Sequence, residues 1–223
     1  ADPRFRFPEP YASLVIGTLK GDQILEAYKG YLYGLNMNSI KDSPTMFARR
    51  VYELMACNTI VISNRSAGIQ ATFKELVVSS DDPEWIMERL AVLRSDPEQY
   101  RMLRLRALRE VMQRHTYKDR VDQIRKDVLA LDPEPKLREV LCIAPPNGLG
   151  GMEGLVGSLR EQTLPGAELM QVDHGDKDML GHAWRTASKG RRLMAIMEPT
   201  DHYGPHFLED MAMSFYYSKA MAA

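Results

Sequence analysis

Two charged side chains and one hydroxyl stand close together between residues 35 and 56. Ser43 and Pro44 are the residue types that favour an N-cap and the first position of a helix. On the helix that would follow, Arg49 and Glu53 are four residues apart and lie on one side. A helix N-terminus attracts anions through its free N–H groups. A cation, a carboxylate and a helix N-terminus that meet at the end of a strand suit a phosphorylated sugar nucleotide. The cation and the N–H groups bind phosphate, and the carboxylate binds hydroxyls.

The same spacing has a simpler interpretation. Arg49 and Glu53 also match a solvated ion pair on a helix surface, and such pairs stabilise a helix only slightly. Spacing alone leaves both interpretations open.

Strands and helices are expected to alternate around this segment. Apolar runs predict strands at residues 14–17, 59–63 and 76–78, and Asp82-Pro83 and Asp96-Pro97 each predict a helix start. The 59–63 run is β-branched, as expected of a strand covered on both faces in a parallel sheet. The turn that follows it places backbone N–H groups at the carboxyl edge of the sheet, where α/β proteins bind ligands. Phosphate binding and an ordinary loop are both compatible with this turn.

Three separated motifs occur in an order that is known from one family. They are the run LNMNSIKDSPTMFARRVYELMACNTIVIS at residues 35–63, the turn SAGI at residues 66–69 and the segment HTYKDR at residues 115–120. Over residues 10–130 the chain resembles the C-terminal, donor-binding domain of GT-B-type bacterial glycosyltransferases of group 1. The resemblance is strongest to the spore-maturation-protein-like group.

This resemblance implies roles for particular residues. Glu53 is expected at the ribose of a nucleotide-diphosphate sugar, and the 66–69 turn is expected near the diphosphate. Asn58 stands where the family usually has glycine, and asparagine tolerates the left-handed cap that this turn needs. The expected donor-binding set is Ser43, Arg49, Arg50, Glu53, Ser66, Gly68, Ile69 and Lys20.

A second resemblance covers residues 137–223. The segments VGSLREQTLP at 156–165, VDHG at 172–175 and EPTDHYGPHFLED at 198–210 are similar to the nucleotide-binding half of inverting, family 2 GT-A-type glycosyltransferases. The resemblance implies a divalent metal, Mn²⁺ or Mg²⁺, held by closely spaced carboxylates, here Glu198 and Asp201. Pro199 and Thr200 stand where acidic residues are usual. A polar turn is therefore the alternative interpretation of these two carboxylates.

Composition and charge exclude several classes of partner. The 223 residues have a net charge of −1, which gives no general attraction to nucleic acid. Arginines between residues 101 and 114 alternate with apolar residues and stand near acidic ones, so a solvated helix face is favoured over a nucleic-acid interface. No apolar run reaches the length of a membrane span, and Cys57 and Cys142 have no zinc-binding spacing. A cytoplasmic protein with no transmembrane segment is expected.

The clearest linker is the segment DPEPK at residues 132–136, because two prolines in five residues favour an extended spacer. It would separate a nucleotide-sugar-binding domain at 1–131 from a partial GT-A-like domain at 137–223. The predicted fold class is α/β, with two Rossmann-like units and mainly parallel sheets.

Two functions remain open at this point. One is a glycosyltransferase, or the donor-binding part of one, that transfers a sugar to a glycan or protein acceptor. The other is a catalytically inactive, glycosyltransferase-derived scaffold that binds a protein partner or forms a homo-oligomer. The altered acidic run and the apolar residues Met211, Met213, Tyr216 and Tyr217 favour the scaffold. A nucleotide-binding regulator of another class is not favoured, because the sequence has no Walker or GxGxxG motif.

Overall fold

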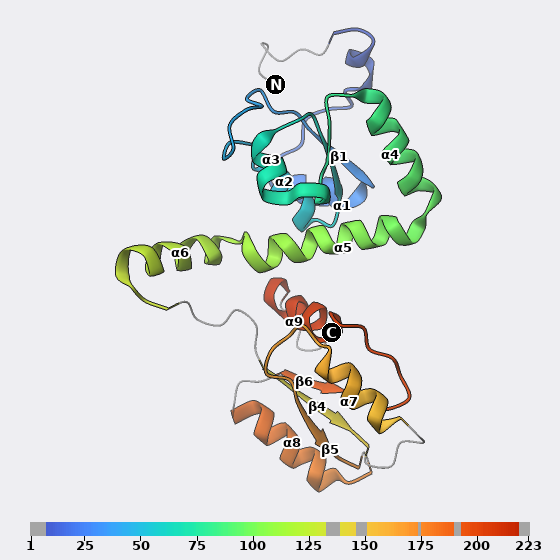
Figure 1. Cartoon of the computed structure of the whole chain (residues 1–223), viewed down its shortest axis with the longest axis vertical. Coiled ribbons are helices and arrows are strands. Elements are labelled where there is room, and N and C mark those ends of the chain that lie inside the picture. The colour runs from blue at the N-terminus through green and yellow to red at the C-terminus, as the bar shows by residue number, and fades with distance from the viewer. Residues whose placement is uncertain (1–7, 133–138, 146–150, 174, 190–192, 219–223) are drawn as a thin grey trace. The chain divides into compact units, whose positions relative to one another are not determined.

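A computed structural model describes residues 8–132, 139–145, 151–173, 175–189 and 193–218. The chain divides into two compact units, 1–120 and 121–223, with the division inside α6 (Tyr117–Leu129). Each unit holds a three-stranded, fully parallel sheet with helices around it (Figure 1). The prediction of two α/β units with parallel sheets is therefore confirmed. The predicted linker 132–136 lies, apart from Asp132, outside the described residues and stays a prediction.

β2 (Ile60–Ser63) is the central strand of the first sheet. It pairs in parallel with β1 (Tyr33–Asn36) on one side and with β3 (Val78–Ser79) on the other. All four β2 residues are buried, as the β-branched sequence predicts. In the register of this sheet Asn36 pairs with Ser63, and Ser63 pairs with Ser79. The carboxyl ends of all three strands therefore carry polar residues at one edge.

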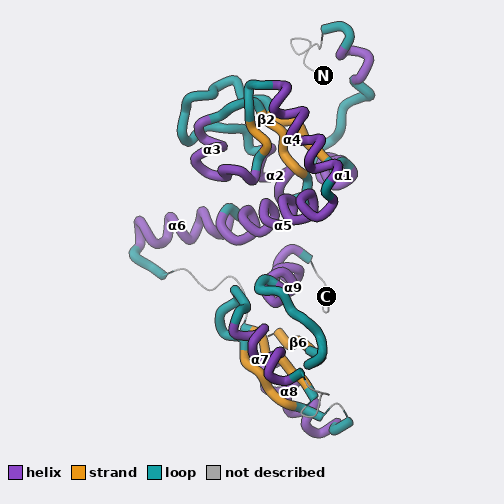
Figure 2. Tube along the Cα trace, turned by 45° about the vertical axis from the view of Figure 1, so that its right-hand side comes forward, coloured by secondary structure: helices purple, strands orange, loops and turns teal. Residues whose placement is uncertain are grey.

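Alternate residues of β2 reach two separate parts of the core, one on each face of the sheet. Val61 packs with α2 (Arg50–Ala56) and α3 (Ala67–Phe73). Ile60 and Ile62 pack with Leu93 of α4 (Pro83–Ser95). The long helix α5 (Pro97–Arg114) contributes residues to both parts of the core. Figure 2 shows it next to α2, with which it packs.

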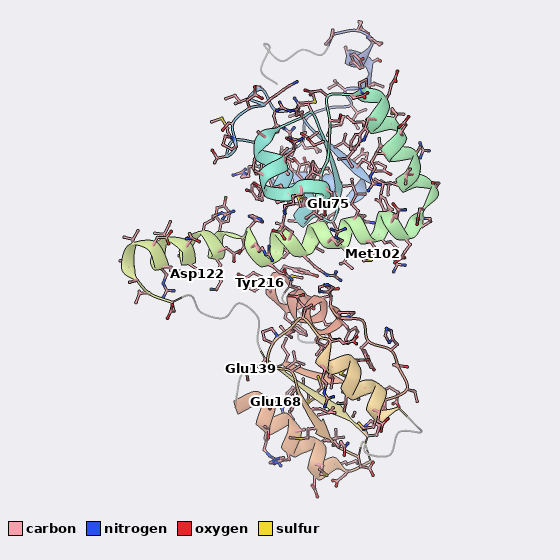
Figure 3. All side chains as sticks on the ribbon, in the orientation of Figure 1. Glu75, Met102, Asp122, Glu139, Glu168 and Tyr216 are labelled. Carbon is pink, nitrogen blue, oxygen red and sulfur yellow. The ribbon has the colours of Figure 1, made fainter. Side chains whose placement is uncertain are left out.

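Aspartates begin the two long helices of this unit. Asp82 caps α4 and Asp96 caps α5 by accepting hydrogen bonds from N–H groups of the first turn, and a proline follows each, as predicted. Glu75 pairs with Arg106 of α5 at 2.8 Å between Oε1 and Nη2 (Figure 3). The remaining elements are η1 (Tyr11–Leu14), α1 (Ile24–Gly30) and η2 (Lys74–Leu76).

The predicted helix start at Ser43 is wrong. The helix begins at Arg50, and residues 43–48 form a loop. The side chain of Asn38 accepts a hydrogen bond from the Ala48 N–H at 3.3 Å, and the ring of Phe47 packs against the core. These tertiary contacts hold the loop, and the local Ser-Pro signal contains no information about them.

The predicted strand at residues 14–17 is also wrong. Residues Tyr11–Leu14 form η1, and residues 15–20 belong to no strand. The side chains of Leu14, Val15 and Ile16 are exposed. Apolar and β-branched residues form a strand only where a neighbouring strand and a packed face receive them, and here the described residues place no strand on the outer side of β1.

The end of α2 follows the prediction. Asn58 has a φ of 59°, in the left-handed region. Its N–H donates to the Met55 carbonyl at 2.9 Å, and the Thr59 N–H donates to the Leu54 carbonyl at 3.0 Å. These bonds satisfy the last carbonyls of the helix, so asparagine serves where glycine is usual.

β4 (Val140–Ala144) is the central strand of the second sheet, between β5 (Glu168–Gln171) and β6 (Leu193–Ile196). All five β4 residues are buried. The helices of this unit are α7 (Met152–Arg160), α8 (Lys177–Lys189) and α9 (Phe207–Tyr217). Across the described ranges, every helix falls short of the length and apolar content that crossing a membrane would require.

Candidate functional site

Four polar side chains gather at the carboxyl edge of the first sheet. Asn36 ends β1, Ser63 ends β2 and Asn38 follows β1, and all three are buried. Asn64 follows Ser63 and is half-buried. Buried polar groups are costly unless they are hydrogen-bonded, so this cluster requires internal partners.

Hydrogen bonds join the four side chains into one network. Ser63 Oγ accepts from Asn36 Nδ2 at 3.1 Å and from Asn38 Nδ2 at 3.0 Å. Asn38 Oδ1 accepts from Asn36 Nδ2 at 3.2 Å and from the Ala48 N–H at 3.3 Å. The Asn38 N–H donates to Asn64 Oδ1 at 2.8 Å, and Asn64 Nδ2 donates to the Asn38 carbonyl at 2.9 Å. The network ties the ends of β1 and β2 to the loop that enters α2.

One atom of the cluster is not satisfied by any described residue. Asn36 Oδ1 is buried and accepts no hydrogen bond from them. The 35–63 run contains Asn36 and Asn38, but neither the run nor the resemblance assigns them a role. The one signal is a pair of amides two residues apart at the end of an apolar strand, a spacing that puts both side chains on the same side of an extended chain.

Arg49 and Glu53 form the predicted ion pair. Arg49 Nε donates to Glu53 Oε1 at 2.7 Å, and the two side chains are 77% and 31% exposed. The hydrogen bond to Glu53 raises the pKa of the Arg49 guanidinium, and a further hydrogen bond to Tyr117 adds to this effect. The pair is therefore accessible at the start of α2, where the solvated and the ligand-binding interpretations both still apply.

Ser66, Gly68 and Ile69 lie at the start of α3, and all three are buried. Ser66 is the N-cap residue, and its Oγ accepts from the Ile69 N–H at 3.4 Å. The Ala67 N–H donates to the Lys41 carbonyl at 2.7 Å. A Cβ added to Gly68 would come within 2.9–3.3 Å of atoms in the loop that precedes α2, so this loop lies directly over the turn. Two of the N–H groups predicted to bind phosphate are thus bonded within the chain.

Two further cations stand at the same edge of the sheet and were not expected from the sequence. Lys41 Nζ pairs with Asp81 Oδ1 at 3.0 Å, and Arg65 Nη1 pairs with Asp42 Oδ1 at 2.8 Å. The hydrogen bond from Lys41 is the main cause that lowers the pKa of the Asp81 carboxyl. Their places in the sequence, just after the end of a strand, are the signal that would have found them.

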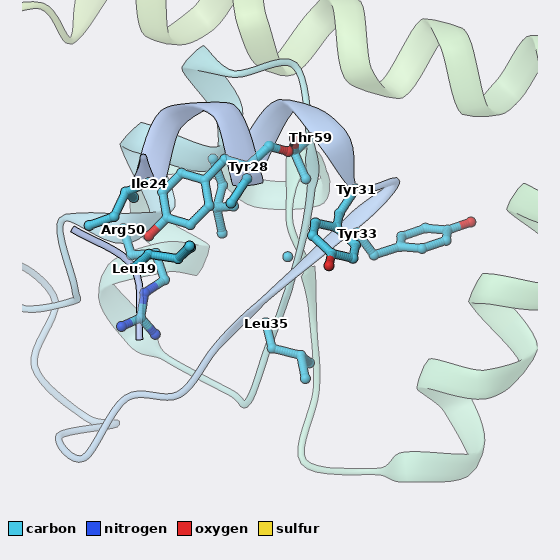
Figure 4. Close-up of a pocket in the computed structure, with 11 residues that line it drawn as sticks. Leu19, Ile24, Tyr28, Tyr31, Tyr33, Leu35, Arg50 and Thr59 are labelled. Atoms are coloured by element: carbon cyan, nitrogen blue, oxygen red, sulfur yellow. Dashed lines mark hydrogen bonds between the residues drawn. The ribbon is translucent and has the colours of Figure 1, made fainter. Parts of the chain in front are cut away.

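The other predicted donor residues are spread over this unit. Lys20 lies in the loop before α1 and is exposed, and Ser43 lies in the loop before α2, where its Oγ is 3.5 Å from the Thr45 nitrogen. Arg50 lines a cavity of about 380 Å³ between α1 and β1, and neither Arg49 nor Glu53 lines this cavity (Figure 4). The structure therefore brings Arg49 and Glu53 together and gathers Ser66, Gly68 and Ile69 beside the loop that carries Ser43, whereas Lys20 and Arg50 lie elsewhere in this unit.

In the second unit, Glu198 and Asp201 belong to one exposed turn. The Asp201 N–H donates to the Glu198 carbonyl at 3.1 Å, and the Tyr203 hydroxyl accepts from the Glu198 N–H at 2.7 Å. Burial of Tyr203 raises the pKa of its hydroxyl. Within the part of the chain that the structure describes, no three His, Cys, Asp or Glu side chains come together as metal ligands.

Comparison with known proteins identifies the first unit. The glycosyl transferase-like family matches residues 6–126, which is more than half of the chain. The chain belongs to the glycosyl transferase-like family. The family match contains β1, β2 and β3 and the whole of the polar cluster at their carboxyl ends. No curated protein and no solved structure matches the chain.

Proposed function

We propose that the first unit binds a nucleotide-diphosphate sugar at the carboxyl edge of its sheet. The protein would then be a glycosyltransferase, or the donor-binding part of one, that passes the sugar to a glycan or other acceptor in the manner of GT-B-type enzymes. The observation that carries the proposal is the family match over residues 6–126, since it spans every residue from Lys20 to Ile69 in the expected donor set. The carboxyl edge of a parallel sheet is also where such folds bind ligands.

In this proposal Glu53 binds the ribose hydroxyls, and Arg49 stabilises the charge that develops on the departing diphosphate. Their mutual ion pair is exposed, and exposed pairs are weak, so a ligand that offers hydroxyls to one partner and phosphate to the other can replace it. Arg50, Ser43 and Lys20 are proposed as further contacts around the same anion.

The turn at Ser66, Gly68 and Ile69 can contact a diphosphate only after one hydrogen bond within the chain is replaced. The Lys41 carbonyl already occupies the Ala67 N–H at 2.7 Å. A phosphate oxygen would have to take the place of this carbonyl, and the loop over Gly68 would have to move away. The charge-assisted bond to phosphate is the stronger of the two, which supports the exchange.

Calorimetric titration of the full chain with UDP, GDP and TDP tests the proposal. One of the three is expected to bind, and Glu53→Gln is expected to weaken it by about tenfold or more, because a carboxylate that holds two hydroxyls makes charge-assisted hydrogen bonds. Glu98→Gln is the matched control, since Glu98 also forms an exposed ion pair on a helix, with Arg101. If none of the nucleotides binds, or if both variants lose affinity equally, the donor site is not at Glu53.

A divalent metal at Glu198 and Asp201 is a separate part of the proposal. Hard cations take six or more oxygen ligands, so these two carboxylates would supply a minority of them and the diphosphate or water the rest. Titration with Mn²⁺ is expected to give binding that Asp201→Asn abolishes. Binding that Asp201→Asn leaves unchanged would remove this metal from the proposal.

The scaffold function is the second candidate, and one observation favours it. The N–H groups of Ala67 and Ile69 are already satisfied inside the chain, as they would be in a descendant that has lost its ligand. On α9, Met211, Tyr216 and Tyr217 are exposed and offer an apolar surface to a partner, whereas Met213, expected to be exposed with them, is buried in the core. A cytoplasmic location belongs to either version of the proposal and is supported by two free cysteines.

A further inference from the structure

The cavity between α1 and β1 is apolar over most of its surface. It has a volume of about 380 Å³, and its walls include Leu19, Ile24 and Leu35 and the rings of Tyr28 and Tyr31. Figure 4 shows the residues from α1 and the preceding loop on one side and the residues along β1 on the other. Leu19, Tyr31 and Leu35 are 51%, 62% and 68% exposed. Apolar surface that stays in contact with water is unfavourable, so a ligand that covers it gains free energy.

This cavity has two chemically different ends. Thr59 lies just before β2, at the amino end of the sheet, and Arg50 begins the helix that follows β1, at the carboxyl end. The lining includes three successive residues of β1, numbers 33–35, which span roughly 10 Å. A mostly apolar lining of this length, with a cation at one end, favours a linear ligand over a compact one.

Arg50 is the one charged residue among those of the described ranges that line the cavity. Among the described residues it has no ion pair and no side-chain hydrogen bond, in contrast to its neighbour Arg49, which is bonded to Glu53. The Thr59 hydroxyl, at the other end, already donates to the Tyr28 carbonyl at 2.6 Å. In the part of the chain that the structure describes, the lining thus carries one unbalanced positive charge and no acidic side chain.

We propose that this cavity binds a single-chain amphipathic anion, an alkyl phosphate, with its apolar chain along β1 and its phosphate on Arg50. The guanidinium offers the planar pair of N–H donors that phosphate accepts. An apolar cavity of about 150 Å³ accommodates benzene, so a cavity of more than twice that size suits a chain of about twelve carbons. A nucleobase fits less well, because the walls offer it few polar partners, and a second protein copy would leave Arg50 facing apolar surface. The inference does not rest on nucleotide binding at Glu53, and because the donor proposal also uses Arg50, the two ligands would compete for this side chain.

Calorimetric titration of the full chain with dodecyl phosphate, below its micelle concentration, tests the inference. One molecule is expected to bind per chain. Arg50→Gln is expected to weaken binding by about tenfold, because it removes a charge-assisted hydrogen bond. Ala27→Phe places a ring inside the cavity and is expected to abolish binding while Arg50 stays in place. Should Ala27→Phe fail to fold, Leu19→Glu at an exposed position of the lining serves the same purpose, since Leu19 lies beside Arg50 in Figure 4 and a carboxylate there would repel the anion.

Controls separate this site from general attraction to a detergent. Arg89→Gln removes a cation that does not line the cavity and is expected to leave the affinity unchanged. Dodecyltrimethylammonium, with the same chain and the opposite charge, is expected to bind at least about tenfold more weakly than dodecyl phosphate. The inference is overturned if dodecyl phosphate does not bind, if Arg50→Gln and Arg89→Gln act alike, or if the two amphiphiles bind equally. A dimer in which a second copy covers the cavity would also overturn the inference. The chain would then be a dimer, Leu35→Glu would dissociate it, and dodecyl phosphate would bind neither the dimer nor the monomer.

Discussion

Asn38 joins more parts of the carboxyl edge than any other side chain described there. Its amide bonds to Asn36, Ser63 and Asn64, and it also accepts from the N–H of Ala48 in the loop before α2. The side chain is buried, so solvent does not compensate for a lost bond. Asn38 therefore sets the position of the loop that carries the chain from β1 to Arg49.

Asn38→Ala is expected to lower the free energy of unfolding by about 1–3 kcal/mol, because it leaves further buried partners unsatisfied beside Asn36 Oδ1. Urea unfolding measures the change. Ser95→Ala is the matched control, since the Ser95 hydroxyl makes an exposed bond to the Val92 carbonyl. Unfolding of Asn38→Ala at the wild-type urea concentration would show that the network does not contribute.

His115 is held as a neutral ring between two aromatic side chains. Its ring centroid lies 5.5 Å from that of Tyr52 and 5.3 Å from that of Phe73. Arg120 Nη2 lies 2.8 Å from His115 Nδ1 and donates to it, which requires a lone pair there, and Nε2 lies 3.3 Å from Glu110 Oε1. Burial, followed by the charge of Arg120, lowers the pKa of His115 below 6.5, although Glu110 acts in the opposite direction.

This shift predicts a pH dependence of stability. Between the lowered pKa of the folded chain and the pKa of the unfolded chain, more of the unfolded chain carries a proton at His115, so the free energy of unfolding falls as the pH falls. The contribution of His115 to stability is complete above the pKa of the unfolded chain. It is lost as the pH falls from there through the lower pKa of the folded chain. Urea unfolding at about pH 7.5 and about pH 5.5 is expected to show a smaller loss for His115→Phe, which packs without titrating. An equal loss of stability in the wild type and in His115→Phe would show that the pH dependence comes from the carboxylates alone.

At the scale of elements, α7 begins where two backbones meet. Gly151 is its N-cap residue, and a Cβ added there would come 2.0 Å from the Pro199 carbonyl oxygen. The glycine therefore allows the start of α7 to lie against the turn that carries Glu198 and Asp201. For Gly157, in the same helix, an added Cβ would have no described atom within 4 Å apart from its chain neighbours and the nearby backbone of α7 itself.

These two glycines predict opposite effects of the same substitution. Gly151→Ala is expected to destabilise the second unit by about 1–3 kcal/mol, because the backbone of the 198–201 turn must shift. Gly157→Ala is expected to stabilise it by about 0.5–1 kcal/mol, because alanine is the better helix former and meets no obstacle. Thermal unfolding followed by circular dichroism compares the two variants. A gain in stability for Gly151→Ala would contradict the close approach of the two backbones.

At the scale of the whole molecule, each unit keeps one cysteine inside. Cys57 and Cys142 are buried, and burial raises the pKa of both thiols, that of Cys142 to about 11. Since the thiolate is the reactive form, neither thiol of the native protein is expected to react with a disulfide reagent near neutral pH, and both are expected to react after unfolding. Rapid reaction of one thiol in the native protein would show that its unit opens.

The sequence by itself determined the elements whose signals are local. The Asp-Pro pairs at 82–83 and 96–97 fix the starts of α4 and α5, because the carboxylate and the proline act on adjacent residues. The β-branched run gives the buried strand β2, and Asn58 gives the left-handed end of α2. The pairing of Arg49 with Glu53 also follows from spacing alone.

The tertiary structure decided what depends on residues far apart in the chain. α2 begins at Arg50 because Asn38 and the core hold residues 43–48 as a loop. Residues 14–17 form no strand because the described residues place no strand beside them. The buried network of Asn36, Asn38 and Ser63 exists because parallel strands bring their carboxyl ends to one edge. The cavity at Arg50 likewise requires α1 and β1 to lie side by side. Such contacts produce no periodic pattern in the sequence, because burial and strand pairing arise only when the sheet has assembled.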